Sequence, residues 1–189
     1  MDSQITVYVR NPRRVVAYVI SAALVVLALL ISQMKALSAE RDSIDLQFSD
    51  ASSAGSIAYN LAKRATDSVN MVTMANKAVP GDPAIDGLQN SRTALESAAS
   101  RADKYTANQN LTIAFYALFD KLNTALKGDT QSLSVLSGLK ADFDSCNAII
   151  SHNTFNADAA KFNKKLGGMP YSLFASLMGI QKLELFEAA

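Results

Sequence analysis

The chain contains a single cysteine, a single histidine and no tryptophan. One cysteine excludes an intramolecular disulfide and any Cys-x-x-Cys redox or zinc motif. With one histidine and four glutamates, the chain cannot build the di-metal site of helical bundles, which needs Glu-x-x-His pairs on several helices. Eight glycines and four prolines in 189 residues are too few for a protein of many short strands. Alanine, leucine, serine, aspartate and lysine dominate instead, a composition typical of packed helices.

Neither sign of charge is in excess, since the chain has 18 lysines and arginines and 17 aspartates and glutamates. Binding to nucleic acid depends on a basic patch or a strongly basic domain. We therefore expect no nucleic-acid partner. The glycines Gly167 and Gly168 do not lead into a Gly-Lys-Ser/Thr sequence, so they do not form a phosphate-binding loop. No cofactor and no metal are expected.

One long stretch near the N-terminus carries no charge. It runs from Val15 to Ile31, and the next three residues extend it to 20. A helix of about 20 apolar residues spans the ~30 Å hydrocarbon core of a bilayer. The sequence therefore predicts a short tail over residues 1–14 and a transmembrane anchor over residues 15–34, with the lipid bilayer as its partner.

A cleaved signal peptide is the alternative interpretation of this stretch. Small residues that could form a cleavage site follow it at Ala36, Ser38 and Ala39. The apolar run is, however, long for the core of a signal peptide. The sequence therefore favours an anchor that is retained.

The charges that flank the anchor predict its orientation. Arg10, Arg13 and Arg14 precede it, whereas Lys35 and Arg41 follow it among acidic residues. Positive charge near a membrane helix favours the cytoplasmic side. We expect a cytoplasmic N-terminus and a domain that lies outside the cell membrane, in the cell envelope.

The rest of the chain has the apolar spacing of helices. We expect the anchor helix to continue to about residue 53, and further helices over 56–79, 82–105, 111–128 and 130–166. Asp82 is a natural N-cap, because Pro83 follows it at the first helical position. Polar or small residues at 51–55, 79–83, 106–110 and 167–170 separate these helices. The predicted fold is all-α: an antiparallel four-helix bundle with coiled-coil-like packing over 35–169, and a docked C-terminal segment over 170–189.

A Phe-Asn pair occurs twice in the last predicted helix, at Phe155 and Asn156 and again at Phe162 and Asn163. Residues seven apart on a helix differ by about 20° around its axis, so both pairs lie on one stripe. We expect both phenylalanines to be buried and both asparagines to be buried and hydrogen-bonded between helices. A buried asparagine in such a seam fixes helix register. A polar pocket for a small ligand is the alternative.

The C-terminal part of the chain resembles the LemA family of bacterial membrane-anchored proteins. That family carries a Tyr-Asn pair, a second Tyr-Asn pair, then a proline, a glycine and a closing Phe-Glu. The residues that match this order are Phe155, Asn156, Phe162, Asn163, Pro170, Ala175, Gly179, Phe186 and Glu187. Both tyrosines of the family are phenylalanines here, which removes two hydroxyl groups.

A second match lies in the predicted helix over 56–79. The family's leucine, paired basic residues and asparagine-aliphatic sequence correspond to Leu61, Lys63, Arg64, Asn70, Met71 and Val72. The family's usual aspartate and proline are replaced by Thr66 and Val69. The resemblance implies a membrane helix that leads into an antiparallel bundle. It implies only a modest functional conclusion, since the family has no established enzymatic activity.

The residues that could support catalysis are isolated. Cys146 and His152 are six positions apart, about 240° around a helix, so they do not converge. We expect Cys146 to pack as a small hydrophobic residue and His152 to be partly buried and hydrogen-bonded. We interpret Lys161, Lys164 and Lys165 as a solvated helix face.

The segment "MPYSLFASLMGI", residues 169–180, has two interpretations. It could be a membrane-surface helix that turns Phe174, Leu177 and Met178 toward lipid. Docking onto the bundle is favoured by the family resemblance and by the charged residues that follow the segment.

The function that these patterns predict is that of a non-catalytic, membrane-anchored scaffold or protein-interaction module. Its expected partner is an unknown protein or a second copy of the chain. The alternative is an enzyme whose site is assembled from aspartates, asparagines or a metal in the bundle.

Overall fold

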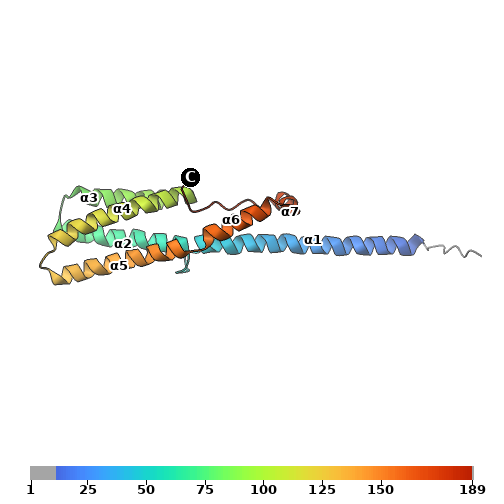
Figure 1. Ribbon diagram of the computed structural model, residues 1–189, viewed down its shortest axis with the longest axis horizontal. Helices are drawn as coiled ribbons and strands as arrows, with labels where there is room; N and C mark the ends of the chain where they lie inside the picture. The colour runs from blue at the N-terminus through green and yellow to red at the C-terminus, as the bar shows by residue number, and fades with distance from the viewer. Residues whose placement is uncertain (1–11, 189) are drawn as a thin grey trace, which may run out of the picture.

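The computed structural model describes residues 12–188 and is built from helices joined by short turns (Figure 1). Within those residues it contains helices and no strand, so the predicted all-α class is confirmed. The seven helices are α1 (Pro12–Ser49), α2 (Ile57–Ala78), α3 (Pro83–Ser97), α4 (Arg101–Ala125), α5 (Thr130–His152), α6 (Phe155–Leu166) and α7 (Tyr171–Met178).

Helices α2 to α5 form a bundle in which successive helices reverse direction (Figure 1). Helix α2 packs against the other three, and α3 packs against α4. Each of the four begins at a side chain that accepts a hydrogen bond from a backbone N–H of its first turn: Ser56, Asp82, Ser100 and Asp129. Such caps satisfy N–H groups that have no partner inside the helix. The predicted cap at Asp82 is confirmed.

The predicted boundary between the third and fourth helices is wrong. Helix α3 ends at Ser97 and α4 begins at Arg101, whereas the polar run over 106–110 had suggested a junction there. Ser100 accepts a hydrogen bond from the backbone N–H of Asp103 and so starts a new helix. The polar run lies inside α4, and its Asn108 is buried in the bundle.

The single helix predicted over 130–166 is also wrong, because α5 and α6 are separated at Asn153. The Oδ1 atom of Asn153 accepts from the backbone N–H of Phe155 at 2.8 Å. Its Nδ2 atom donates to the carbonyl of Gly55, in the turn between α1 and α2, at 2.9 Å. Asparagine side chains compete with helical hydrogen bonds in this way. A contact distant in sequence therefore helps to fix the break.

Helix α1 has two different halves. Every residue from Arg13 to Gln33 is exposed, and the most apolar 18-residue window of the helix has a mean hydropathy of 2.8 with none of it buried. The second half packs into the protein through Leu37, Ile44 and Phe48. By length and composition the helix can cross a membrane, a property that a signal sequence shares.

Helix α6 lies against the second half of α1 and runs antiparallel to it. Asp158 accepts a hydrogen bond from Gln47 at 3.3 Å, and Lys165 pairs with Glu40 at 2.5 Å. The two contacts lie seven residues apart on each helix, so the helices stay side by side over about 10 Å. Helix α6 therefore belongs with α1 and extends away from the bundle (Figure 1).

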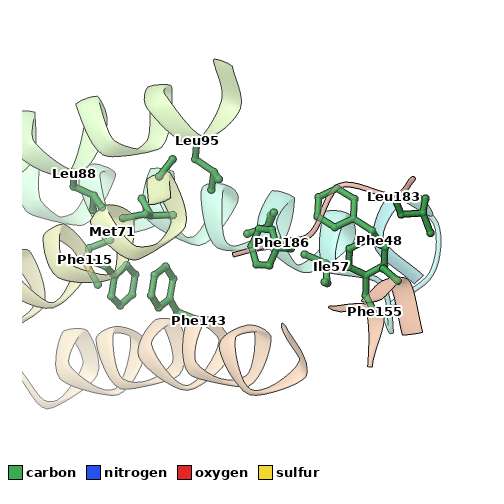
Figure 2. Packing of buried hydrophobic residues seen from close by; sticks show 14 of the residues in the cluster. Phe48, Ile57, Met71, Leu88, Leu95, Phe115, Phe143, Phe155, Leu183 and Phe186 are labelled. Carbon is green, nitrogen blue, oxygen red and sulfur yellow. The ribbon is translucent and has the colours of Figure 1, made fainter. Parts of the chain in front are cut away.

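Buried side chains form two neighbouring groups, which Figure 2 shows. One lies inside the bundle and includes Met71, Leu88, Leu95, Phe115 and Phe143. The other lies where α1, α2, α6 and the C-terminal residues meet, and includes Phe48, Ile57, Phe155, Leu183 and Phe186. In the second group the ring of Phe48 lies 5.5 Å from that of Phe155 and 5.6 Å from that of Phe186. This second group connects the bundle to α1.

Candidate functional site

The repeated asparagines of α6 hold the non-helical residues 180–188, which we name the tail. Asn163 accepts from the backbone N–H of Leu183 at 2.8 Å and donates to the carbonyl of Leu183 at 2.7 Å. Asn156 makes the same pair of hydrogen bonds with Phe186, both at 2.8 Å. Each amide side chain thus pairs with one tail residue as a neighbouring strand would.

The seven-residue spacing matches the spacing of the tail. Seven residues of helix rise about 10.5 Å, and three residues of extended chain rise about 10 Å. The positions Asn156 and Asn163 are therefore as far apart as Phe186 and Leu183. Both of these tail residues are buried, whereas Glu184 between them is exposed.

The predicted role of these asparagines is corrected by this geometry. Both side chains are largely buried, as predicted, but they bond the tail rather than a neighbouring helix. Phe155 and Phe162 are buried as expected, with exposures of 0% and 1%. The reason is that an extended backbone offers the paired N–H and C=O that an amide matches, whereas a neighbouring helix has used its own internally.

Arg101, at the start of α4, joins the tail to α1. Its guanidinium pairs with Asp45 at 2.5 Å and donates to the carbonyl of Glu184 at 3.1 Å. The same group lies 4.5 Å from the ring centre of Phe48 and 4.8 Å from that of Phe155. Partial burial alone would raise the pKa of Asp45, but the hydrogen bond and charge of Arg101 outweigh it and lower that pKa. Arg101 thus links the bundle to the α1–α6 pair.

Arg64 occupies the interior of the bundle and is 0% exposed. Its guanidinium donates to Asn108 and, at 2.6 Å, to Thr112, while its Nε atom has no partner. It also lies 4.0 Å from the ring centre of Phe143, which stacks on Phe115. Burial lowers the pKa of Arg64 to about 10, so the group is a cation at neutral pH. Its hydrogen-bond partners are neutral.

A cavity of about 480 Å³ lies next to Asn108 and Thr112, the partners of Arg64, between α4, α5, α6 and the tail. We name it the polar cavity. It falls within the usual size range of ligand sites, about 300–1,000 Å³. Amides and hydroxyls line part of it, from Tyr105, Asn108 and Gln109 on α4 and from Asn147 and Ser151 on α5. Apolar side chains that include Ile57 and Ile150 line the rest, and none of the described lining residues is charged. Asn156 of α6 and Phe186 of the tail also line the cavity.

The Arg64 guanidinium fixes the orientation of Asn108, one of the amides that line this cavity. The side chain is 2% exposed, and its Oδ1 atom accepts from the Arg64 guanidinium. An arginine can only donate, so the amide oxygen must face Arg64 and the amide nitrogen must face away from it. No described residue accepts from that nitrogen. The contact with a cation also makes it a stronger donor.

Two buried titratable groups, Asp67 and Cys146, lie near Arg64. Asp67 is 4% exposed, and its Oδ2 atom lies 3.8 Å from Lys63 without a hydrogen bond. Burial raises the pKa of Asp67, and burial raises the pKa of the Cys146 thiol. Cys146 is buried as expected, and a thiol with a raised pKa is a weak nucleophile. Among residues 12–188 no three histidine, cysteine, aspartate or glutamate side chains gather as metal ligands.

The remaining sequence candidates are not brought into one site. Asn70 is exposed on α2, away from the buried Arg64. His152 is exposed at the end of α5, so the expectation that it is partly buried is wrong. Lys161 and Lys164 are exposed as expected, whereas Lys165 is half-buried.

Sequence reasoning missed Asn108, Arg101 and Asn153. Asn108 could have been found from its spacing, since it lies on the same helix stripe as the buried apolar residues of α4. The polar residues around it in the sequence concealed this pattern. Arg101 and Asn153 had no such signal, because their partners Asp45 and Gly55 are distant in sequence.

Comparison of the chain with protein-family models gives no match, and comparison with curated proteins gives none. Neither comparison bears on the resemblance to the LemA family. That resemblance stays a prediction, which rests on the order and spacing of the matching residues.

Proposed function

We propose that the protein is a non-catalytic, membrane-anchored helical module of the LemA type. It binds or scaffolds a polypeptide partner at the bacterial cell envelope. The observation that carries the proposal is the continuity of α1, which is one helix from its exposed apolar half to its buried half. The bundle is therefore attached to the apolar half without a flexible linker.

The packing of α1 supports retention of the apolar half. Leu37 is 1% exposed, and Met34 packs against the same core. Cleavage near Ser38 to Glu40 would remove both side chains from the folded protein. Losing a buried leucine side chain costs about 2–5 kcal/mol, so a cleaved form would be less stable than the intact chain.

The polar cavity is the place where we expect the partner to bind. The protein already recognises an extended backbone with amide side chains, since Asn156 and Asn163 pair with the tail. The cavity continues this surface with the oriented amide of Asn108 and the exposed amides of Gln109 and Asn147. An uncharged lining with both donors and acceptors suits a peptide backbone, which carries both. The expected partner is therefore an extended polypeptide segment.

The anchor is tested by the N-terminus and membrane association of the native protein. We expect N-terminal sequencing to find a start before Val15, and we expect the protein to stay in the membrane pellet after alkaline washing. A mature start near Ser38 would show that the apolar run was only a signal.

The binding site is tested by placing a photo-cross-linking residue at Gln109 or Asn147, on the rim of the cavity, in full-length protein in cells. Asn123, exposed on the same α4 but outside the cavity, is the matched control. We expect a polypeptide adduct from both rim positions and not from the control. An adduct of doubled mass would identify a second copy of the chain as the partner. Adducts from Asn123 alone would place the partner elsewhere.

A further inference from the structure

Helix α7 has one buried face and one exposed apolar face. Phe174 points into the protein and is 8% exposed. Leu173 and Leu177 are 54% and 78% exposed, and Met169, four positions before Leu173, is 73% exposed. Residues at a spacing of four fall on one stripe of a helix, so Leu173 and Leu177 form an apolar ridge on α7, and the exposed Met169 lies just before the helix begins at Tyr171. A ridge of this kind on a water-exposed surface indicates a contact surface.

The place of α7 along α1 points to what covers this ridge. Helix α6 reaches the level of Glu40 through its ion pair with Lys165, and α7 follows it and packs against α1. The carbonyl of Gln181, just beyond α7, accepts from Arg41 at 3.2 Å. The first residue of α1 after the exposed span that is partly buried is Met34. Helix α7 therefore lies beside the end of the apolar span.

The orientation of α7 agrees with this position. Figure 1 shows α7 beyond α6, beside the middle of α1, with its axis turned across that of α1. A helix that crosses a membrane-spanning helix in this way lies parallel to the membrane surface. Interfacial helices lie in that plane, with their apolar face about 5–10 Å into the boundary between headgroups and acyl chains.

We propose that α7 is an interfacial helix that inserts Leu173 and Leu177 into the outer surface of the bilayer that α1 crosses. This inference rests on the proposed membrane anchor. The neighbouring side chains suit such a surface: Tyr171 is half-buried next to Lys165, whose ammonium lies 4.7 Å from its ring centre, and tyrosines and lysines gather at the interface. A second contact with the bilayer, away from the axis of α1, fixes the tilt of the bundle.

Tryptophan fluorescence tests the proposal, because the chain has no tryptophan of its own. Three variants of the full-length protein are reconstituted into phosphatidylcholine and phosphatidylglycerol vesicles: Leu177→Trp on α7, Val25→Trp within the apolar span, and Ile113→Trp on α4. Ile113 is the matched control, since it is 71% exposed and apolar but lies on the bundle. The vesicles carry lipids brominated either near the headgroups or near the bilayer centre, which quench tryptophan at that depth.

We expect the Val25→Trp variant to be quenched most by bromines near the bilayer centre. The Leu177→Trp variant should be quenched most by bromines near the headgroups, and it should emit at a shorter wavelength than the Ile113→Trp control. The Ile113→Trp variant should be quenched by neither. Quenching of Val25→Trp without quenching of Leu177→Trp would overturn the interfacial helix and leave the anchor intact. If Val25→Trp is not quenched, the anchor itself is wrong.

Discussion

The side chain of asparagine carries one donor and one acceptor group in the same plane, as a peptide group does. In this protein that likeness is used twice, at Asn156 and Asn163, to pair with the backbone of the tail. A backbone partner cannot be removed by mutation. The consequences of substitution therefore differ from those of an asparagine pair between helices.

Asn163→Ala and Asn163→Leu are expected to destabilise the protein to a similar extent, by about 1–3 kcal/mol each, because the N–H and C=O of Leu183 lose their partners. An asparagine that only set helix register would instead tolerate leucine. The measurements are thermal melts in detergent and hydrogen exchange of the Leu183 amide. Asn123→Ala, at an exposed position of α4, is the control. Unchanged exchange at Leu183 in both variants would refute the pairing.

Asp67→Asn is expected to stabilise the protein at neutral pH. The pKa of Asp67 is raised above its ordinary value of 3.8, chiefly by burial, so its charged form opposes folding at neutral pH. That cost falls as the pH drops through the folded pKa and is absent below 3.8. The stabilisation that Asp67→Asn gives should therefore shrink as the pH falls. Thermal melts of both proteins across this pH range measure it.

Asp142→Asn is the control for this prediction. Asp142 contacts the same Lys63, at 3.6 Å, but its side chain is 63% exposed. Exposed ion pairs contribute about 0–1 kcal/mol, so this variant should change stability little. Equal effects of the two variants would show that burial of Asp67 is not the cause.

Among the elements, the tail has little structure of its own and depends on its neighbours. It contacts α6 through the two asparagines, α4 through Arg101, and α1 through Arg41. Its Phe186 covers Phe48 and packs edge-on against Tyr105 at 5.4 Å. The tail therefore connects α4 to the α1–α6 pair.

Truncation after Gly179 is expected to destabilise the junction of the bundle with α1, since it removes the buried Leu183 and Phe186. Removal of a buried phenylalanine side chain alone costs about 3–5 kcal/mol. The matched truncation after Phe186 removes only residues 187–189 and should have little effect. Limited proteolysis near residues 50–56, between α1 and α2, measures the difference. Equal resistance of both truncated proteins would contradict this role of the tail.

As a whole the described protein is an elongated molecule, with the bundle at one end and the exposed apolar half of α1 at the other (Figure 1). In the proposed membrane-anchored protein, the side of the membrane on which the bundle lies is decided by the orientation of α1, because this helix is continuous. The basic residues before the span predict that the bundle is outside the cytoplasm.

Thiol labelling tests this orientation. In a Cys146→Ser background, Val135→Cys places a thiol at a position that is 53% exposed on α5. We expect a membrane-impermeant maleimide to label this thiol in cells whose outer barrier has been opened but whose cell membrane is still intact. The unmodified chain is the control, because its Cys146 is buried. Labelling only after the cells are lysed would mean that the bundle is cytoplasmic.

Much of the fold follows from local pattern. The apolar run, the cap at Asp82 and the buried stripe of Phe155 and Phe162 were all predictable, because each depends on residues within a few positions. The helix break before Arg101 was misplaced, because the polar run over 106–110 concealed the local cap at Ser100. The break at Asn153 was missed, since Asn153 is held partly by Gly55 and helical periodicity has no information about a partner so distant.

The sequence by itself determined the helical class, the length and apolarity of the span, and the equal spacing of the two Phe-Asn pairs. The tertiary structure alone decided what Asn156 and Asn163 bind, which amides surround the polar cavity, and where α7 lies along α1. The physical reason is range. Helix formation and apolarity are properties of neighbouring residues, whereas a hydrogen bond between a side chain and a tail residue 20 or 30 positions away exists only after packing has brought them together.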